Sequence, residues 1–164
     1  MPSLHPFCVW LQSTPASVTI QSIGWIVPTA QTIHILAIAA VMSAVLMIDL
    51  RLIGILGRDQ PIARVSRRFG PAIWWTLPIL FVTGAIQIVG EPARSLENPV
   101  FRLKMALLAA ALLVTLSYQI PLRKNPSYWD PLHGRHRLAQ LIAVLSLPLW
   151  VGIVFAGRWI AYTG

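Results

Sequence analysis

The stretch PTAQTIHILAIAAVMSAVLMIDLRLIGIL, residues 28–56, decides the fold class of this chain. At about 1.5 Å of rise per residue, a helix of this length crosses the ~30 Å hydrocarbon core of a bilayer. Three polar residues, His34, Asp49 and Arg51, interrupt the apolar run. An unpaired polar side chain in a spanning helix costs about 2.5 kcal/mol or more, so each of the three is a candidate functional residue.

The composition of the chain is that of a membrane protein. Hydrophobic residues make up 56% and charged residues 11% of its 164 residues, and the mean hydropathy is +0.68. These values lie outside the usual balance of a soluble domain. The net charge is +8, and the basic residues lie at the ends of the apolar runs. This distribution favours membrane lipids over nucleic acid as partners. Cys8 is the only cysteine, which excludes an intrachain disulfide and a cysteine-based metal cluster.

Four apolar runs predict an all-α fold, a transmembrane four-helix bundle over residues 28–164. We expect the spans at about residues 28–56, 71–90, 99–120 and 138–162. Asn98 and Pro99 form a helix-start signal, a capping residue followed by proline at the first helical position. Pro121 is expected to stop the third span. Residues 1–27 are too polar to span, and their tryptophans predict an N-terminal interfacial segment, with an unordered terminus as the alternative.

The distribution of lysine and arginine predicts the orientation. The loops that follow the first and third spans, residues 51–70 and 121–137, hold nine of these residues, whereas the opposite side holds four. Loops rich in Lys and Arg stay in the cytoplasm. We therefore expect both termini outside the cytoplasm, and the beginning of the first span at the outer rim of the bundle.

The outer rim collects the residues that could hold a cofactor. His34 lies about 9 Å along the first span. A thioether and three cations are expected at a similar level: Met105, Arg102, Lys104 and Arg158. One interpretation is a haem b with His34 as axial ligand and the basic residues on its propionates. The alternative is structural: His34 bonds a neighbouring helix, and the cations extend to the interface or pair with Glu91 and Glu97.

Two further groups of polar residues have structural and functional interpretations. Asp49 is expected to pair with a neighbouring helix or loop, and its candidate partners are Arg64, Arg67 and Arg68. A proton relay through Asp49 is the less favoured alternative, because a relay needs further carboxylates or histidines. His133 and His136 lie three residues apart near Asp130, a spacing that could bind a metal, but Gly134 weakens a helix there and lipid head groups fit as well.

Small residues and one tryptophan suggest close helix contacts. Gly152 and Ala156 form a small-xxx-small pair in the fourth span, which serves packing within the bundle or between subunits. Trp150 is expected near the middle of the bilayer, where its indole N–H needs a partner. Because residues 1–27 are not expected to bury themselves against a bundle of this size, we expect them to be held by another membrane subunit or a second copy.

Several short motifs resemble those of one family. They are P-x-x-Q-x-x-H at 28–34, D-L-R-L-I-G at 49–54, T-G at 83–84, E-P…N-P-x-F-R-x-K at 91–104 and G-R-W-I-A-Y at 157–162. Together they resemble an uncharacterised family, a domain of unknown function, of four-helix bacterial inner-membrane proteins, over about residues 25–162. More distantly the chain is similar to copper-resistance D-type proteins and small four-helix b-type cytochromes. It departs from the family at Gln31, where a glutamate is usual, and at Tyr118–Gln119, a region that often carries a histidine.

The resemblance implies a bacterial inner-membrane location, where the Lys and Arg distribution predicts both termini in the periplasm. The sequence holds no nucleophile–base pair, phosphate-binding loop or carboxylate dyad, which favours a non-catalytic subunit or accessory protein of a larger membrane assembly over an enzyme. The alternative is an electron-transfer subunit, a small b-type cytochrome or a quinone-handling protein with its site at the outer rim. Transport is a third class, weakened by the lack of ligands at the middle of the spans.

Overall fold

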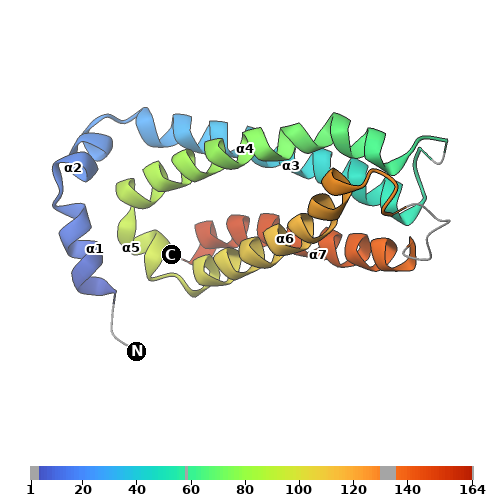
Figure 1. Ribbon diagram of the computed structural model, residues 1–164. Coiled ribbons are helices and arrows are strands. Elements are labelled where there is room, and N and C mark those ends of the chain that lie inside the picture. Colours follow the sequence, from blue (N-terminus) through green and yellow to red (C-terminus); the bar gives the residue numbers. More distant parts are fainter. Residues whose placement is uncertain (1–3, 58, 130–135, 164) are drawn as a thin grey trace.

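The computed structural model describes residues 4–57, 59–129 and 136–163, and all regular structure in these ranges is helical (Figure 1). The helices are α1 (His5–Gln12), α2 (Pro15–Ser22), α3 (Ile26–Ile53), α4 (Ile62–Gly90), α5 (Pro92–Leu96), α6 (Pro99–Lys124) and α7 (His136–Thr163). Four of them, α3, α4, α6 and α7, are long and apolar enough to cross a membrane. The prediction of an all-α chain with four spans after a separate N-terminal segment is confirmed, and that segment forms the short helices α1 and α2. The four candidate spans indicate a multi-pass membrane protein.

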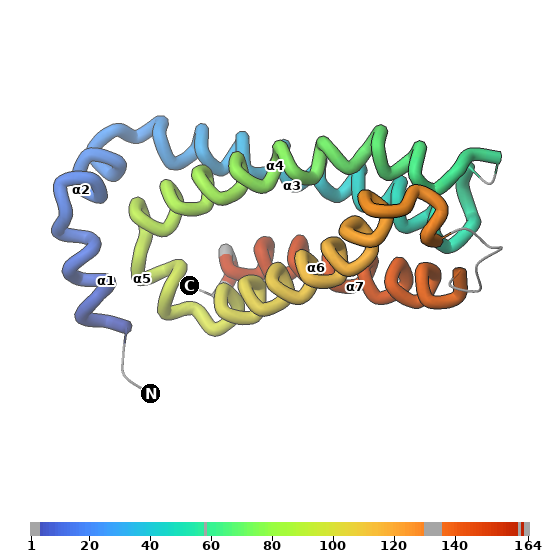
Figure 2. Tube along the Cα trace, viewed as in Figure 1, coloured from blue at the N-terminus to red at the C-terminus, as the bar shows by residue number. Residues whose placement is uncertain are grey.

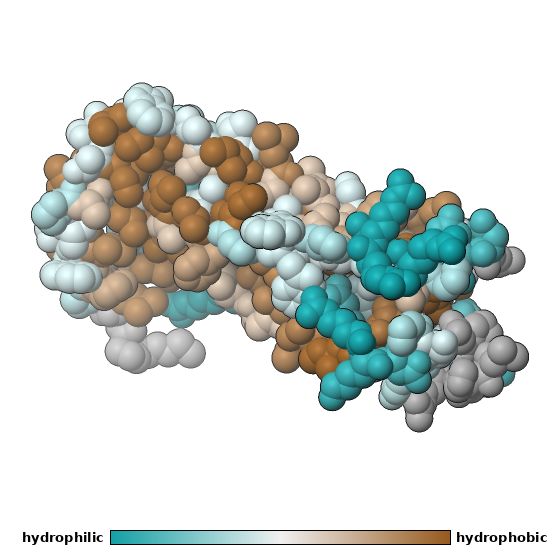
Figure 3. Space-filling model, turned by 45° about the horizontal axis from the view of Figure 1, so that its top comes forward, coloured by the Kyte–Doolittle hydropathy of each residue, from teal (hydrophilic) through white to brown (hydrophobic). Residues whose placement is uncertain are grey.

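The four long helices form an elongated bundle with two different ends (Figure 2). We call the end that carries α1, α2, α5 and the last turns of α7 the terminal end. The opposite end, where α3 connects to α4 and α6 to α7, is the loop end. Apolar residues cover most of the face shown in Figure 3, and hydrophilic residues gather at the loop end. Large side chains such as Phe81 and Trp75, which are 79% and 76% exposed, lie on the outside of the bundle, as expected for a surface that faces lipid.

Helix pairs build the core. The helix α3 packs against α4 and α7, and α6 packs against α7. The contacts bury small and β-branched residues, which allow the backbones to approach closely: Val41, Ala44, Val45 and Ile48 on α3, Ile73 on α4, Ala111 on α6, and Ala139, Ala143 and Ile153 on α7. Gly152 belongs to this packing, since a β-carbon there would lie 3.4 Å from Leu107 of α6.

Helix boundaries follow the predicted signals at one end of α6 but not at the other. Asn98 caps α6 as expected, and its side chain accepts a hydrogen bond from the Val100 N–H at 2.9 Å. The prediction that Pro121 stops this span is wrong, because α6 continues to Lys124. Proline removes only one hydrogen bond, and the following turn recovers stability by burying Leu122 and by the bond from the Asn125 N–H to the Pro121 carbonyl at 2.9 Å.

The first helices are fixed to the terminal end by their own chain. The Ser17 hydroxyl donates to the Val89 carbonyl at 2.7 Å, and the Gln21 amide donates to the Gly90 carbonyl at 3.0 Å. Ser17 is fully buried, and Cys8 of α1 is 1% exposed. The expectation that residues 1–27 cannot bury themselves against the bundle is therefore wrong at Cys8 and Ser17, whereas most other residues of α1 and α2 are exposed, Trp10 to 60%. The contacts of α2 form because its polar side chains reach carbonyl groups left free where α4 ends.

Candidate functional site

His34 has its protonation pattern fixed by one neighbour. Its Nδ1 lies 2.7 Å from the Oγ1 of Thr83 on α4. The Thr83 hydroxyl already donates its proton to the Ile79 carbonyl at 2.7 Å. A hydroxyl has a single proton, and with that proton donated to Ile79 the Thr83 oxygen accepts from His34, so that Nδ1–H is the donor in this arrangement. In neutral His34 the other ring nitrogen, Nε2, therefore carries a free lone pair that can accept a hydrogen bond or bind a metal.

Residues of all four spans surround His34 or Lys104. A β-carbon at Gly84 of α4 would lie 3.6 Å from the Cε1 of His34, and one at Gly157 of α7 would lie 3.6 Å from the Nζ of Lys104 on α6. His34 and Lys104 are both partly buried, and the Lys104 ammonium lies within electrostatic range of the imidazole. We call these five residues, His34, Thr83, Gly84, Lys104 and Gly157, the His–Lys site. It lies toward the terminal end of the bundle.

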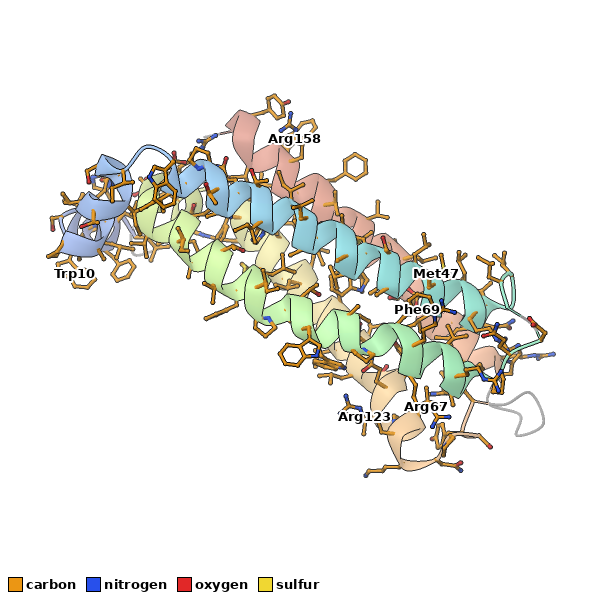
Figure 4. The ribbon with its side chains drawn as sticks, turned by 90° about the horizontal axis from the view of Figure 1, so that it is seen from above. Trp10, Met47, Arg67, Phe69, Arg123 and Arg158 are labelled. Atoms are coloured by element: carbon orange, nitrogen blue, oxygen red, sulfur yellow. The ribbon has the colours of Figure 1, made fainter. Side chains whose placement is uncertain are left out.

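The structure places only two of the five residues predicted for the outer rim within electrostatic range of each other. These two are His34 and Lys104, whereas Arg102 is exposed and Met105 is 46% exposed. Arg158 is also exposed and turns back on its own helix, where it donates to the Tyr162 hydroxyl at 2.9 Å; it points away from the bundle in Figure 4. The two nearby carboxylates are occupied elsewhere: Glu91 pairs with Arg94 at 2.9 Å and Glu97 with His5 at 3.0 Å.

A haem with two axial ligands does not fit the described residues. Met105 lies one residue beyond Lys104, so its side chain leaves α6 about 100° around the helix from it. His5 is on the surface with Glu97, and His136 begins α7 at the loop end. Among the residues described, His34 is thus the one histidine in the His–Lys site. The hydrogen bond from Nδ1–H to Thr83 fixes the ring of His34, as such bonds do in histidines that bind metals. A haem with His34 as its single protein ligand therefore fits these residues better than a haem with two axial ligands.

A second group of polar side chains lies inside the bundle without partners. Both carboxylate oxygens of Asp49, the hydroxyls of Thr115 and Ser146, and the indole N–H of Trp150 have no hydrogen-bond partner among the described residues, although each residue is at most 2% exposed. Ser146 lies next to Asp49. Other hydroxyls in the spans donate to the carbonyl three or four residues earlier, as those of Ser43, Thr76 and Ser117 do. The Thr115 and Ser146 hydroxyls do not take this option.

The expected pairing of Asp49 with arginine is not found in the described part of the chain. Arg64, Arg67 and Arg68 lie on the first two turns of α4 and are exposed. Arg51 donates instead to the Gln60 carbonyl at 2.8 Å, across the α3–α4 connection. The physical reason is orientation: Asp49 points into the core on α3, whereas the arginines point outward from α4.

Of the two histidines near the α6–α7 connection that could bind a metal, the structure describes only one. Asp130 and His133 lie outside the described residues, and His136 is the first residue of α7. Within the described ranges no three His, Cys, Asp or Glu side chains form a group that could hold a metal ion.

Sequence reasoning missed the role of Thr83 and Gly84. The signal for them was present, since the T-G pair at 83–84 is one of the motifs quoted above, as are those that contain His34, Lys104 and Gly157. These four motifs, far apart in the sequence, meet at the His–Lys site.

No curated protein and no solved structure matches the chain. Residues 10–163 match a family of unknown function, DUF6644, and the chain belongs to this family.

Proposed function

We propose that this protein is an electron-transfer-related membrane subunit that binds a quinol head group at the His–Lys site. The observation that carries the proposal is the free Nε2 lone pair of His34 beside the Lys104 ammonium. A quinol carries two hydroxyl groups on opposite sides of an apolar ring. One hydroxyl can donate to Nε2, and the oxygen of the other can accept from Lys104. This proposal belongs to the electron-transfer class that the sequence offered as its alternative.

The surroundings of the two polar groups are apolar spans that approach them closely. A β-carbon at Gly84 or Gly157 would already touch His34 or Lys104, so the two glycines let these side chains lie against the backbones of α4 and α7. The site lies in spans whose outer surfaces face lipid, so that a membrane-soluble ligand reaches it from the bilayer. Few polar groups at fixed positions in an apolar wall are the usual composition of a small-molecule site.

A haem b bound by His34 alone is the second candidate function. The bond from Nδ1–H to Thr83 supports it because such bonds orient histidine ligands and raise their basicity. His34 would bind the iron and Lys104 would pair with a propionate, and the bound group would supply one-electron transfer. A Soret band in the purified protein that is lost in His34→Leu would favour the haem over the quinol.

The proposal places the protein in the bacterial inner membrane with both termini, and therefore the His–Lys site, on the periplasmic side. The nine-to-four split of Lys and Arg supports this orientation. A role as subunit, with other membrane proteins or a second copy as partners, is retained as part of the proposal. Its support no longer includes α1, α2 or Gly152, because these contact their own chain.

Binding measurements on the protein in mild detergent test the proposal. We expect saturable binding of a short-chain benzoquinol, kept reduced under argon, by titration calorimetry. His34→Leu and Lys104→Met should each weaken binding about tenfold, because each removes one hydrogen bond that involves a strong acceptor or a charge. Met105→Leu, next to Lys104 but outside the site, is the matched control and should bind as the wild type does.

Thr83→Val separates the role of His34 in binding from its role in packing. This variant keeps the imidazole but frees Nδ1, so that the proton can move to Nε2 and the lone pair is no longer fixed toward the ligand. We expect weaker quinol binding with little change in stability. Wild-type affinity in both Thr83→Val and His34→Leu would refute the proposed site.

A further inference from the structure

A pocket at the loop end contains two arginines from different spans. It is a cavity of about 480 Å³ between the first turns of α4 and the last turns of α6. Ser66, Arg67 and Trp74 line it from α4, and Gln119, Leu122 and Arg123 line it from α6. Figure 4 shows Arg67 and Arg123 near each other at this end of the bundle. The pocket lies at the opposite end from the His–Lys site and does not depend on the proposed function.

The charge of this pocket is not neutralised by the described part of the protein. Within the described ranges, neither Arg67 nor Arg123 takes part in a salt bridge, and none of the described residues that line the cavity is acidic. The guanidinium of Arg123 lies 5.7 Å from the centre of the Trp74 ring, a cation–π contact that holds it over the cavity. Arginine is the side chain best suited to bind phosphate, because its N–H groups match two phosphate oxygens.

The floor of the pocket is held in place by a chain of hydrogen bonds. The Trp74 indole N–H donates to the Oε1 of Gln119 at 2.7 Å, and the Nε2 of Gln119 donates to the Tyr118 hydroxyl at 3.1 Å. Gln119 is 4% exposed, so its amide is fixed rather than free to rotate. A fixed floor below two arginines is a preformed cavity, which lowers the entropy cost of binding.

The walls are apolar where they approach the lipid-facing surface. Leu122 and the Trp74 ring line the cavity together with Pro71. Trp75, the neighbour of Trp74, is 76% exposed on the outside of α4. A ligand here would thus meet cations at the end of the span and an apolar wall toward the bilayer. This order of groups, charge first and hydrocarbon second, is the order found in a phospholipid.

We propose that this pocket binds the head group of an anionic phospholipid, with its phosphate between Arg67 and Arg123 and its glycerol region against Leu122 and Trp74. Basic pockets between spans on the cytoplasmic side bind such head groups in other membrane proteins. The basic loop end is the side that the Lys and Arg count places in the cytoplasm. The bound lipid would link α4 to α6 across the cavity.

Lipid retention and thermal stability test this proposal. We expect the purified protein to retain phosphatidylglycerol in native mass spectrometry and to be stabilised by it more than by phosphatidylcholine, which has no net charge. Arg67→Gln and Arg123→Gln should each weaken phosphatidylglycerol binding about fivefold, the effect of one basic residue near an anionic lipid. Arg64→Gln is the matched control, since Arg64 is exposed on the first turn of α4 but does not line the cavity.

Three results would overturn the proposal. One is equal binding of the two lipids, and another is an equal loss of phosphatidylglycerol in Arg64→Gln and Arg67→Gln. The third is protection by inorganic phosphate alone to the same degree, which would assign the pocket to a soluble anion. Melting in phosphatidylcholine checks that the variants are folded, because a change of an exposed arginine should leave it unaltered.

Discussion

Replacing Asp49 by asparagine should stabilise this protein. Asp49 is 1% exposed, and the Ser146 hydroxyl is close to its carboxylate but does not form a hydrogen bond of normal geometry with it; no other described residue supplies a partner. A buried polar group without a partner costs about 1–3 kcal/mol, and more if it is charged. Asparagine has nearly the same shape but carries no charge. Its amide can also donate to the hydroxyl of the adjacent Ser146. We therefore expect Asp49→Asn to raise the free energy of unfolding by about 1–3 kcal/mol.

The assay is unfolding in mixed micelles of dodecyl maltoside and increasing SDS, followed by tryptophan fluorescence. Asp59→Asn provides the same chemical change at an exposed position in the α3–α4 connection, and it should alter the free energy of unfolding by less than about 0.5 kcal/mol. The difference between the two variants isolates the effect of burial.

A loss of stability in Asp49→Asn would refute this reasoning. It would mean that the carboxylate is stabilised by a partner that the asparagine cannot bind, such as a bound cation. Asp49 and Ser146 would then act as oxygen ligands, and the stability of the wild type would depend on the cation in the buffer.

Three further predictions concern the terminal end and the orientation. Gly90→Ala should destabilise the protein by about 1–3 kcal/mol, measured in the same SDS titration, because its β-carbon would lie 3.1 Å from Ile20 and push α2 away from α4. Alkylation of Cys8 by iodoacetamide at pH 8, measured by mass spectrometry, should be slow in the folded protein and fast after unfolding. The reason is that burial raises the pKa of this thiol, so that the reactive thiolate forms only at higher pH. Equally fast alkylation of the folded and unfolded protein would argue against docking of α1. A reporter fused after Gly164 should be active outside the cytoplasm and one inserted near Gln60 inside it, and the reverse result would move the His–Lys site to the cytoplasmic side.

The sequence alone was sufficient for the membrane class and the number of spans. Hydropathy is a local property, since every residue in a spanning helix meets the bilayer core whatever its tertiary contacts are. The cap at Asn98 was predictable for the same reason, because the donor lies two residues from the acceptor. Pro121 was misjudged because the turn after it is stabilised by the burial of Leu122, which is a tertiary effect.

Only the tertiary structure decided which polar residues meet. His34 and Thr83 are 49 positions apart, and their hydrogen bond depends on the rotation of α3 and α4 about their axes. Each residue turns a helix by about 100°, so neighbours such as Lys104 and Met105 face different surroundings, one within the His–Lys site and the other 46% exposed. The same rotation directs Asp49 into the core and Arg67 away from it. A sequence gives the depth of a side chain in the membrane, but the direction in which it points is set by how the helices pack.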